Sequence, residues 1–139
     1  MNKEQLRGYI NLKREREQIE QQLAEIEASL YSPKIQQLSG MPAGPAREGN
    51  AQEGLIVKHV EIQQHYEELL GRLACELLTI EKAIEALPSR ERQLIRLHYI
   101  NGLTWSQVAE AMNYSWTQVH RIHAEALRLL KTEEGEENE

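Results

Sequence analysis

The sequence predicts an all-α fold, in which a long helical hairpin or coiled-coil segment is followed by a helix-turn-helix. The composition is polar, with 27% charged residues and no Phe among 139 residues, so it can supply only a thin core. Apolar residues recur at steps of three and four in two long segments, which is the spacing of amphipathic helices. Near the C-terminus, short apolar stretches alternate with residues that start and stop helices.

Residues 1–31 are predicted to form one helix. This segment contains no Pro and a single Gly near its start, and it is rich in strong helix formers such as Glu, Gln, Arg, Lys and Leu. Its apolar residues lie on one stripe with roughly heptad spacing, as in a coiled coil or a helical hairpin. The stripe consists of Tyr9, Leu12, Ile19, Leu23, Ile26 and Leu30, with Arg16 in one of its positions.

Residues 32–54 are predicted to be a loop, because seven Pro and Gly residues occur within them. Residues 55–87 carry a second apolar stripe, which predicts a long helix that stops before Pro88. This helix could lie antiparallel on the first one, or it could pair with a second copy of the chain. The stripe consists of Ile62, Tyr66, Leu69, Leu73, Leu77, Ile80, Ile84 and Leu87.

Residues 88–131 carry the signals of three further helices. Ser89 is placed to cap a first helix that ends near Asn101, and Gly102 suits the left-handed conformation that follows many helices. Two capping boxes come next, each a Ser or Thr with Gln three residues later. They predict a short helix, a tight turn at Asn113 and a longer recognition helix, which together form a helix-turn-helix. The boxes are Thr104 with Gln107 and Ser115 with Gln118.

The net charge of −6 is unevenly distributed along the chain. Residues 88–131 carry six Lys and Arg against three acidic residues, whereas residues 1–87 carry ten against fourteen. Residues 132–139 contain five Glu and no basic residue, and we expect them to form a disordered, solubilising tail. The predicted helix-turn-helix is therefore the basic part of the chain, which is what a nucleic-acid-binding segment requires.

The C-terminal third resembles sigma-factor region 4 over about 45 residues. The similarity lies in Leu87–Arg92, Leu94–Tyr99, Gly102–Thr104, Val108–Glu110, Tyr114–Ser115 and Val119 with Ile122–Leu127. The complete chain looks like the short phage and prophage regulators of the ArpU/RinA kind, and this resemblance implies promoter binding and activation of late genes. The chain departs from the sigma pattern at the first reading positions, where Trp116 and Thr117 replace the frequent Arg-Glu pair, so a −35-like target is not implied.

The DNA-binding residues are expected at the starts of the last two helices, because the N-terminal part of a recognition helix meets base edges and helix N-termini bind phosphates. Arg121 could pair with guanine and Gln118 with adenine, unless Gln118 is used in its capping box. Thr117 and Trp116 could contact thymine methyl groups, and Trp116 could instead pack on a neighbouring helix. The complete set is Thr104, Ser106, Gln107, Ser115, Trp116, Thr117, Gln118, His120, Arg121 and Arg128.

No catalytic motif accompanies the acidic residues of the long helices, so we expect no enzyme, no cofactor and no metal site. His120 and His123 are three residues apart on one helix, but a third ligand is not evident. The expected partners are double-stranded DNA, RNA polymerase and a second copy of the chain, in the cytoplasm of a bacterial host. No apolar stretch reaches the length of a membrane span. A phage small-terminase-like packaging protein, a sigma-like factor and a coiled-coil adaptor are the alternatives.

Overall fold

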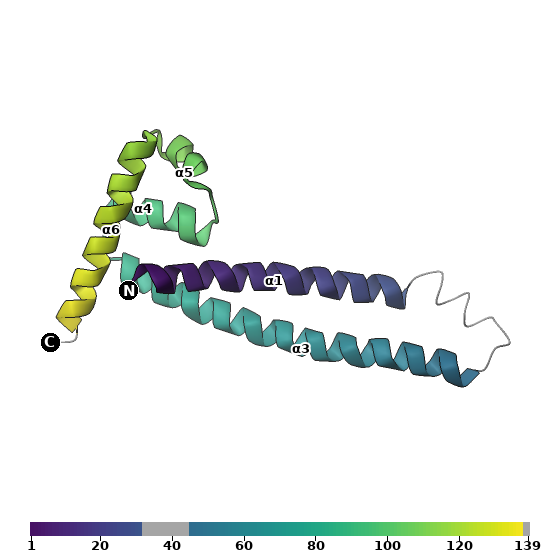
Figure 1. The fold of residues 1–139 in the computed structure, drawn as a ribbon. Helices are drawn as coiled ribbons and strands as arrows, with labels where there is room; N and C mark the ends of the chain where they lie inside the picture. The colour runs from purple at the N-terminus through teal and green to yellow at the C-terminus, as the bar shows by residue number, and fades with distance from the viewer. Residues whose placement is uncertain (32–44, 138–139) are drawn as a thin grey trace. The chain divides into compact units, whose positions relative to one another are not determined.

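The computed structural model describes residues 1–31 and 45–137, and for residues 45–50 and 133–137 it describes the backbone alone. Every regular element in this part of the chain is helical, which confirms the predicted all-α class (Figure 1). In chain order the elements are α1 (Lys3–Leu30), α3 (Pro45–Ile84), α4 (Ser89–Ile95), a π-helical turn η1 (Arg96–Ile100), α5 (Trp105–Met112) and α6 (Trp116–Glu137). Among the described residues, none of the helices has the length and apolar character that crossing a membrane would need.

The chain forms two compact units, and the helices α1 and α3 each contribute to both. One unit comprises Arg14–Gly71 and is a pair of helices. The other comprises Met1–Lys13 together with the chain from Arg72 onward, and it contains the helix-turn-helix.

In the unit Arg14–Gly71, α1 and α3 pack antiparallel within the same chain. Tyr66 Oη donates a hydrogen bond of 2.7 Å to Glu20, and His59 Nε2 lies 3.3 Å from a carboxylate oxygen of Glu27. The later of the two α1 residues, Glu27, thus faces the earlier of the two α3 residues, as antiparallel helices require. The predicted apolar stripes form the contact, since Ile19, Leu23 and Leu69 are buried. The antiparallel arrangement is therefore the one of the two predicted alternatives that the structure adopts in this unit.

The predicted loop over residues 32–54 is wrong for its second half, because α3 begins at Pro45 instead of near Leu55. Proline is favoured in the first turn of a helix, where its missing N–H has no partner to lose. The glycines at 49 and 54 each weaken the helix by about 1 kcal/mol without ending it, and Ala, Arg, Glu and Gln surround them. The first part of the predicted loop, residues 32–44, lies outside the described residues.

The unit with the helix-turn-helix is built around α6. This helix packs against α4 and α5, and η1 contacts both α4 and α5. The core of this unit consists mainly of apolar side chains that are almost fully buried. Its members include Leu94, Ile95, Tyr99, Val108, Val119, Ile122, Ala126 and Leu130.

The first turns of α1 are part of the same unit. Leu6 is 0% exposed, and Met1 and Tyr9 are also buried. The Lys13 ammonium donates a hydrogen bond to the carbonyl of Ile100, the last residue of η1. A helix leaves its final carbonyls without intrahelical partners, so this lysine satisfies one of them and complements the negative end of the helix dipole. The N-terminal segment thus contributes both apolar contacts and a polar contact to the helix-turn-helix unit.

Three helix boundaries near the motif differ from the sequence-based expectation. The helix α3 ends at Ile84, three residues before the predicted Leu87, and a turn follows in which the Leu87 amide donates to the Ile84 carbonyl. Ser89 does not cap α4, since Pro88 holds the cap position and no side chain makes a capping hydrogen bond. The predicted disordered tail is wrong for residues 132–137, because α6 continues to Glu137. Residues 138–139 lie outside the described part.

Candidate nucleic-acid interface

Both capping boxes predicted for the motif are present. At the start of α5, the Gln107 amide donates to Thr104 Oγ1 (3.2 Å), and the Thr104 amide donates to the Gln107 side chain (2.9 Å). At the start of α6, the Gln118 amide donates to Ser115 Oγ (3.2 Å), and the Ser115 amide donates to the Gln118 side chain (3.0 Å). Such caps contribute about 1 kcal/mol each, so both helix starts are fixed by local hydrogen bonds.

The turn between α5 and α6 depends on Asn113. This residue lies at the predicted tight turn and has the left-handed conformation, with φ 58° and ψ 39°. Its amide closes the end of α5 by donating to carbonyls of the preceding turn. A residue with a Cβ pays about 1–2 kcal/mol for this conformation, a cost that Asn reduces by local hydrogen bonding. Gly102, with φ 76°, ends the preceding helical segment in the same region of conformational space.

Helix α6 presents two different faces along its length. Val119, Ile122 and Ala126, which follow one another at steps of three and four residues, are buried against α4 and α5. The opposite face carries polar side chains that are exposed at the N-terminal end of the helix, where a recognition helix would meet bases. The exposed predicted residues of this end are Ser115, Trp116, Thr117, Gln118 and Arg121; those at the start of α5 are Thr104, Ser106 and Gln107.

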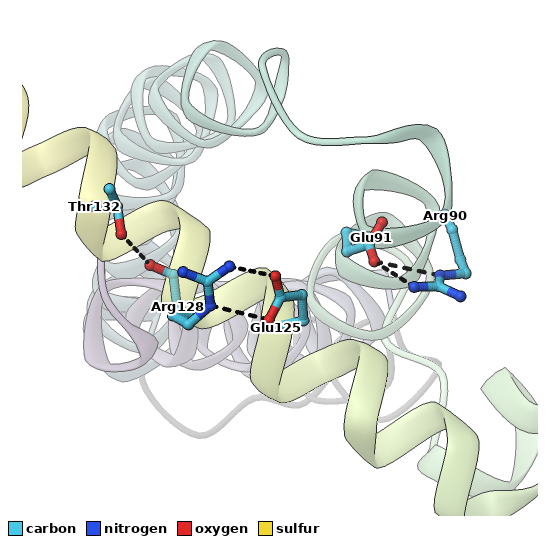
Figure 2. A network of polar contacts seen from close by, with 5 residues as sticks. All are labelled: Arg90, Glu91, Glu125, Arg128 and Thr132. Carbon is cyan, nitrogen blue, oxygen red and sulfur yellow. Dashed lines mark hydrogen bonds and ion pairs between the residues drawn. The ribbon is translucent and has the colours of Figure 1, made fainter.

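Arg121 and Arg128 are both exposed on α6 but differ in their partners. Arg121 makes no hydrogen bond or ion pair with any other described residue. Arg128 binds Glu125 through two of its guanidinium nitrogens, and its carbonyl accepts a hydrogen bond of 3.0 Å from Thr132 (Figure 2). The guanidinium of Arg128 lowers the pKa of the Glu125 carboxyl by hydrogen bonding. Of these two arginines, Arg121 is therefore the one whose donors are not used by another described residue.

Gln118 is engaged in its capping box, one of the two roles considered for it. Its side-chain oxygen accepts the hydrogen bond from the Ser115 amide. Paired recognition of adenine requires the Gln oxygen to accept from the base while its nitrogen donates. The capping box occupies that oxygen, so the free side-chain nitrogen of Gln118 is the part available for a contact.

A cluster of aromatic and imidazole rings lies beneath this surface, and residue spacing along the chain did not predict it. His98 stacks on Trp105 with ring centroids 3.7 Å apart and meets Tyr99 edge-on at 4.7 Å. Tyr99 Oη and His123 Nε2 share a buried hydrogen bond of 2.7 Å. His98 is further fixed because its Nδ1–H donates to the Leu103 carbonyl at 2.8 Å. The cluster thus connects η1, α5 and α6, and Trp105 anchors the start of the short helix α5 in it.

Burial shifts the titration of this cluster. Desolvation lowers the pKa of His123 to about 4, and the nearby cations Lys3 and Arg7 act in the same direction. Desolvation also lowers the pKa of His98, against the effect of its hydrogen bond to Leu103, and raises the pKa of Tyr99 to about 12. The described residues include no group of three potential ligands arranged to hold a metal ion. His98 and His123 pack against the other rings of the cluster and each make one hydrogen bond within the unit.

The arginines of α4 and η1 are held by acidic and backbone partners. Arg90 binds the buried carboxylate of Glu91 at 2.9 Å (Figure 2), and Arg96 binds Glu81 at 2.6 Å. Arg92 donates to the Glu85 carbonyl at 3.4 Å. A buried carboxylate needs such a partner because its desolvation is costly. Arg92 and Arg96 therefore connect α4 and η1 to the end of α3 and the turn after it, whereas Arg90 pairs within α4. The burial of Glu91 was not foreseen from the sequence.

Comparison with protein families bears directly on this arrangement. Residues 83–132 match the family model of Sigma-70, region 4, and this range runs from the last residues of α3 into the second half of α6. A sigma-70 region 4 domain of the helix-turn-helix type is present in this chain. Comparisons with curated proteins and with solved structures gave no significant match.

The match to sigma-70 region 4 begins at Ala83. It therefore leaves out the first turns of α1, although they belong to the same compact unit. It does include both capping boxes, the Asn113 turn and the ring cluster. The resemblance inferred from the sequence is confirmed at the level of this domain, which is of the DNA-binding class. The position of the exposed side chains at the start of α6 is the geometry that such a domain needs for reading a major groove.

Proposed function

We propose that this protein is a sequence-specific DNA-binding transcription regulator that reads the major groove with the start of α6. The observation that carries this proposal is the Arg121 guanidinium, which is exposed and has no partner among the described residues, on the polar surface of a sigma-70 region 4 domain. Arg binds the O6 and N7 acceptors of guanine with two parallel hydrogen bonds, the commonest specific contact in the major groove. The protein acts by binding in the bacterial cytoplasm, without a catalytic reaction or a cofactor.

The contacts divide into those that position the protein and those that read sequence. Thr104, Ser106 and Gln107 at the start of α5, and Arg128 further along α6, are suited to phosphates, because two of the first amides of α5 lack a helical acceptor and Arg128 is exposed. Thr117, Gln118 and Arg121 are suited to base edges. The overall charge of −6 does not oppose DNA binding, since the negative excess lies outside residues 88–131.

Arg121→Ala is expected to weaken binding to the operator by roughly 5- to 150-fold, the equivalent of 1–3 kcal/mol for one bidentate contact to guanine. The operator is first located by footprinting the purified full-length protein on genomic fragments, and affinities are then measured by fluorescence anisotropy across a salt series. Binding to unrelated DNA should change far less, because base contacts add little there.

Two arginine variants serve as controls for this measurement. Arg128→Ala should weaken operator and unrelated DNA alike and reduce the salt dependence, as loss of a phosphate contact does. Arg14→Ala, an exposed position in the helix pair, should leave both affinities unchanged. Equal affinities of the wild type and Arg121→Ala for the operator would show that α6 is not the reading helix.

The finer part of the proposal is activation of phage late genes in contact with RNA polymerase. The support is the sigma-70 region 4 domain and the resemblance of the whole chain to ArpU/RinA-type regulators. In a reconstituted transcription assay, the protein should raise transcript levels from a promoter adjoining its footprint. Repression of the same promoter would contradict this part and leave DNA binding intact.

We further propose that the active form is a homodimer joined through the helix pair. Ile56, Val57 and Val60 on α3 are each about half exposed, and three neighbouring apolar side chains on one helix favour association. Val60→Asp is therefore expected to convert a dimer into a monomer in multi-angle light scattering, whereas Lys58→Asp on the same turn should not. A ring of eight or more copies would instead favour the alternative, a packaging protein of the small-terminase type.

A further inference from the structure

Trp116 is the most conspicuous apolar side chain on the proposed reading surface. It is the first residue of α6, and 61% of its surface is exposed. Indole is large and mainly apolar, so exposing it costs solvation free energy that contact with a ligand would recover. Its position at the N-terminal end of the recognition helix places it where such a helix meets base edges.

The Trp116 ring has a defined neighbour one turn along the helix. Its centroid is 3.9 Å from that of His120, with an angle of 50° between the planes. His120 in turn lies 5.0 Å from Trp105 at the start of α5, and Trp105 is stacked on His98. His120 therefore lies between the exposed indole and the ring cluster of the domain core. Among the ring contacts of the described residues, His120 is the one that links the Trp116 indole to this cluster.

His120 itself is poorly suited to reading a base. It is only partly exposed, and its Nε2 is buried without a hydrogen-bond partner among the described residues. A base contact from that nitrogen would require the ring to leave its position between the two tryptophans. The contacts of His120 are those of a packing group, although the sequence had placed it among the residues that read DNA.

We propose that His120 is a positioning residue that holds the Trp116 indole against thymine methyl groups, and that Trp116 determines specificity for those thymines. The C5-methyl group of thymine is the apolar feature of the major groove, and an exposed apolar ring is complementary to it. This inference rests on the proposed DNA-binding function. It specifies which base the surface selects and assigns His120 and Trp116 different roles.

Deoxyuridine provides a direct probe, because it differs from thymidine only in lacking this methyl group. The full-length protein is titrated with operator duplexes in which single thymines are replaced by deoxyuridine. Wild-type protein should lose about fourfold in affinity at one or two positions, as expected for one methyl group removed from an apolar contact. Trp116→Ala should abolish this sensitivity at those positions, whereas Thr117→Ala should preserve it.

A double-mutant cycle tests the role of His120. His120→Ala should reduce the deoxyuridine effect and should have no further effect on affinity when combined with Trp116→Ala, because it acts through the indole. His120→Phe, which keeps a ring between the two tryptophans, should retain the wild-type sensitivity, and His120→Gln should lose it. Circular dichroism and thermal melting verify that each variant is folded, and His120→Phe keeps the test valid if His120→Ala is unstable.

The outcomes separate the inference from the function on which it rests. Additive effects of His120→Ala and Trp116→Ala, or rescue by Gln instead of Phe, would overturn the positioning role. Wild-type binding that is insensitive to deoxyuridine at every thymine would overturn the thymine contact while leaving specific DNA binding established. Failure of the wild type to distinguish any sequence from bulk DNA would overturn the proposed function itself.

Discussion

Leu6→Ala is expected to destabilise the helix-turn-helix unit by about 2–5 kcal/mol, although Leu6 lies far in sequence from the sigma-70 region 4 match. The side chain is 0% exposed in the unit that contains the helix-turn-helix, so its truncation leaves a cavity there. Both tryptophans of the chain, Trp105 and Trp116, belong to this unit. Urea unfolding followed by tryptophan fluorescence therefore reports on it alone.

Glu4→Ala is the matched control for this experiment, because Glu4 is exposed on the same turn of α1. It should change the free energy of unfolding by less than about 0.5 kcal/mol, as surface substitutions usually do. An equally small effect of Leu6→Ala would mean that the start of α1 does not stabilise the DNA-binding unit in solution.

Acidification is expected to destabilise the same unit by about 2–3 kcal/mol between pH 7 and pH 4.5. The pKa of His123 is about 4 in the folded protein and 6.5 as a free side chain, so the unfolded chain binds the proton first as the pH falls. The stabilisation that neutral His123 contributes is therefore fully present above pH 6.5 and is lost progressively as the pH falls toward 4. The lowered pKa of His98 adds to the loss in the same direction.

Substitution of His123 isolates this effect. The free energy of unfolding is measured from urea curves at a series of pH values, with tryptophan fluorescence as the signal. His123→Phe should flatten the pH dependence between pH 6.5 and 4.5, and His65→Gln in the helix pair should not alter it. The carboxyls of Glu81 and Glu125 have lowered pKa values and contribute below this range. An unchanged slope in His123→Phe would contradict the assignment.

The features that the sequence predicted correctly around the motif are local. The capping boxes of Thr104 and Ser115 form hydrogen bonds over three residues, and the conformations of Gly102 and Asn113 depend on their own backbone. The apolar stripes of α1 and α3 also follow from spacing within a single helix. Such features need no knowledge of which segments meet in three dimensions.

The features that were missed depend on contacts between distant segments or on competing local signals. Tyr99 and His123 are 24 residues apart, and the burial of Glu91 follows from the packing around α4, so neither could be read from spacing. The attachment of Lys13 to Ile100 joins residues separated by 87 positions. Pro45 carried a usable signal, since proline favours the first turn of a helix, but the surrounding glycines outweighed it in the prediction.

The capping boxes determine which backbone groups of the motif remain available to a ligand. In α6, Ser115 accepts the hydrogen bonds of the third and fourth amides, through Oγ for Gln118 and through its carbonyl for Val119. The amides of Trp116 and Thr117 precede the first residues that can bond within the helix. In α5 the same arrangement leaves the amides of Trp105 and Ser106.

Each helix thus offers one pair of adjacent main-chain N–H donors, which suits the oxygens of a single phosphate group. Because these donors belong to the backbone, the anchoring of the protein on the duplex would persist through changes of the side chains at positions 106 and 117.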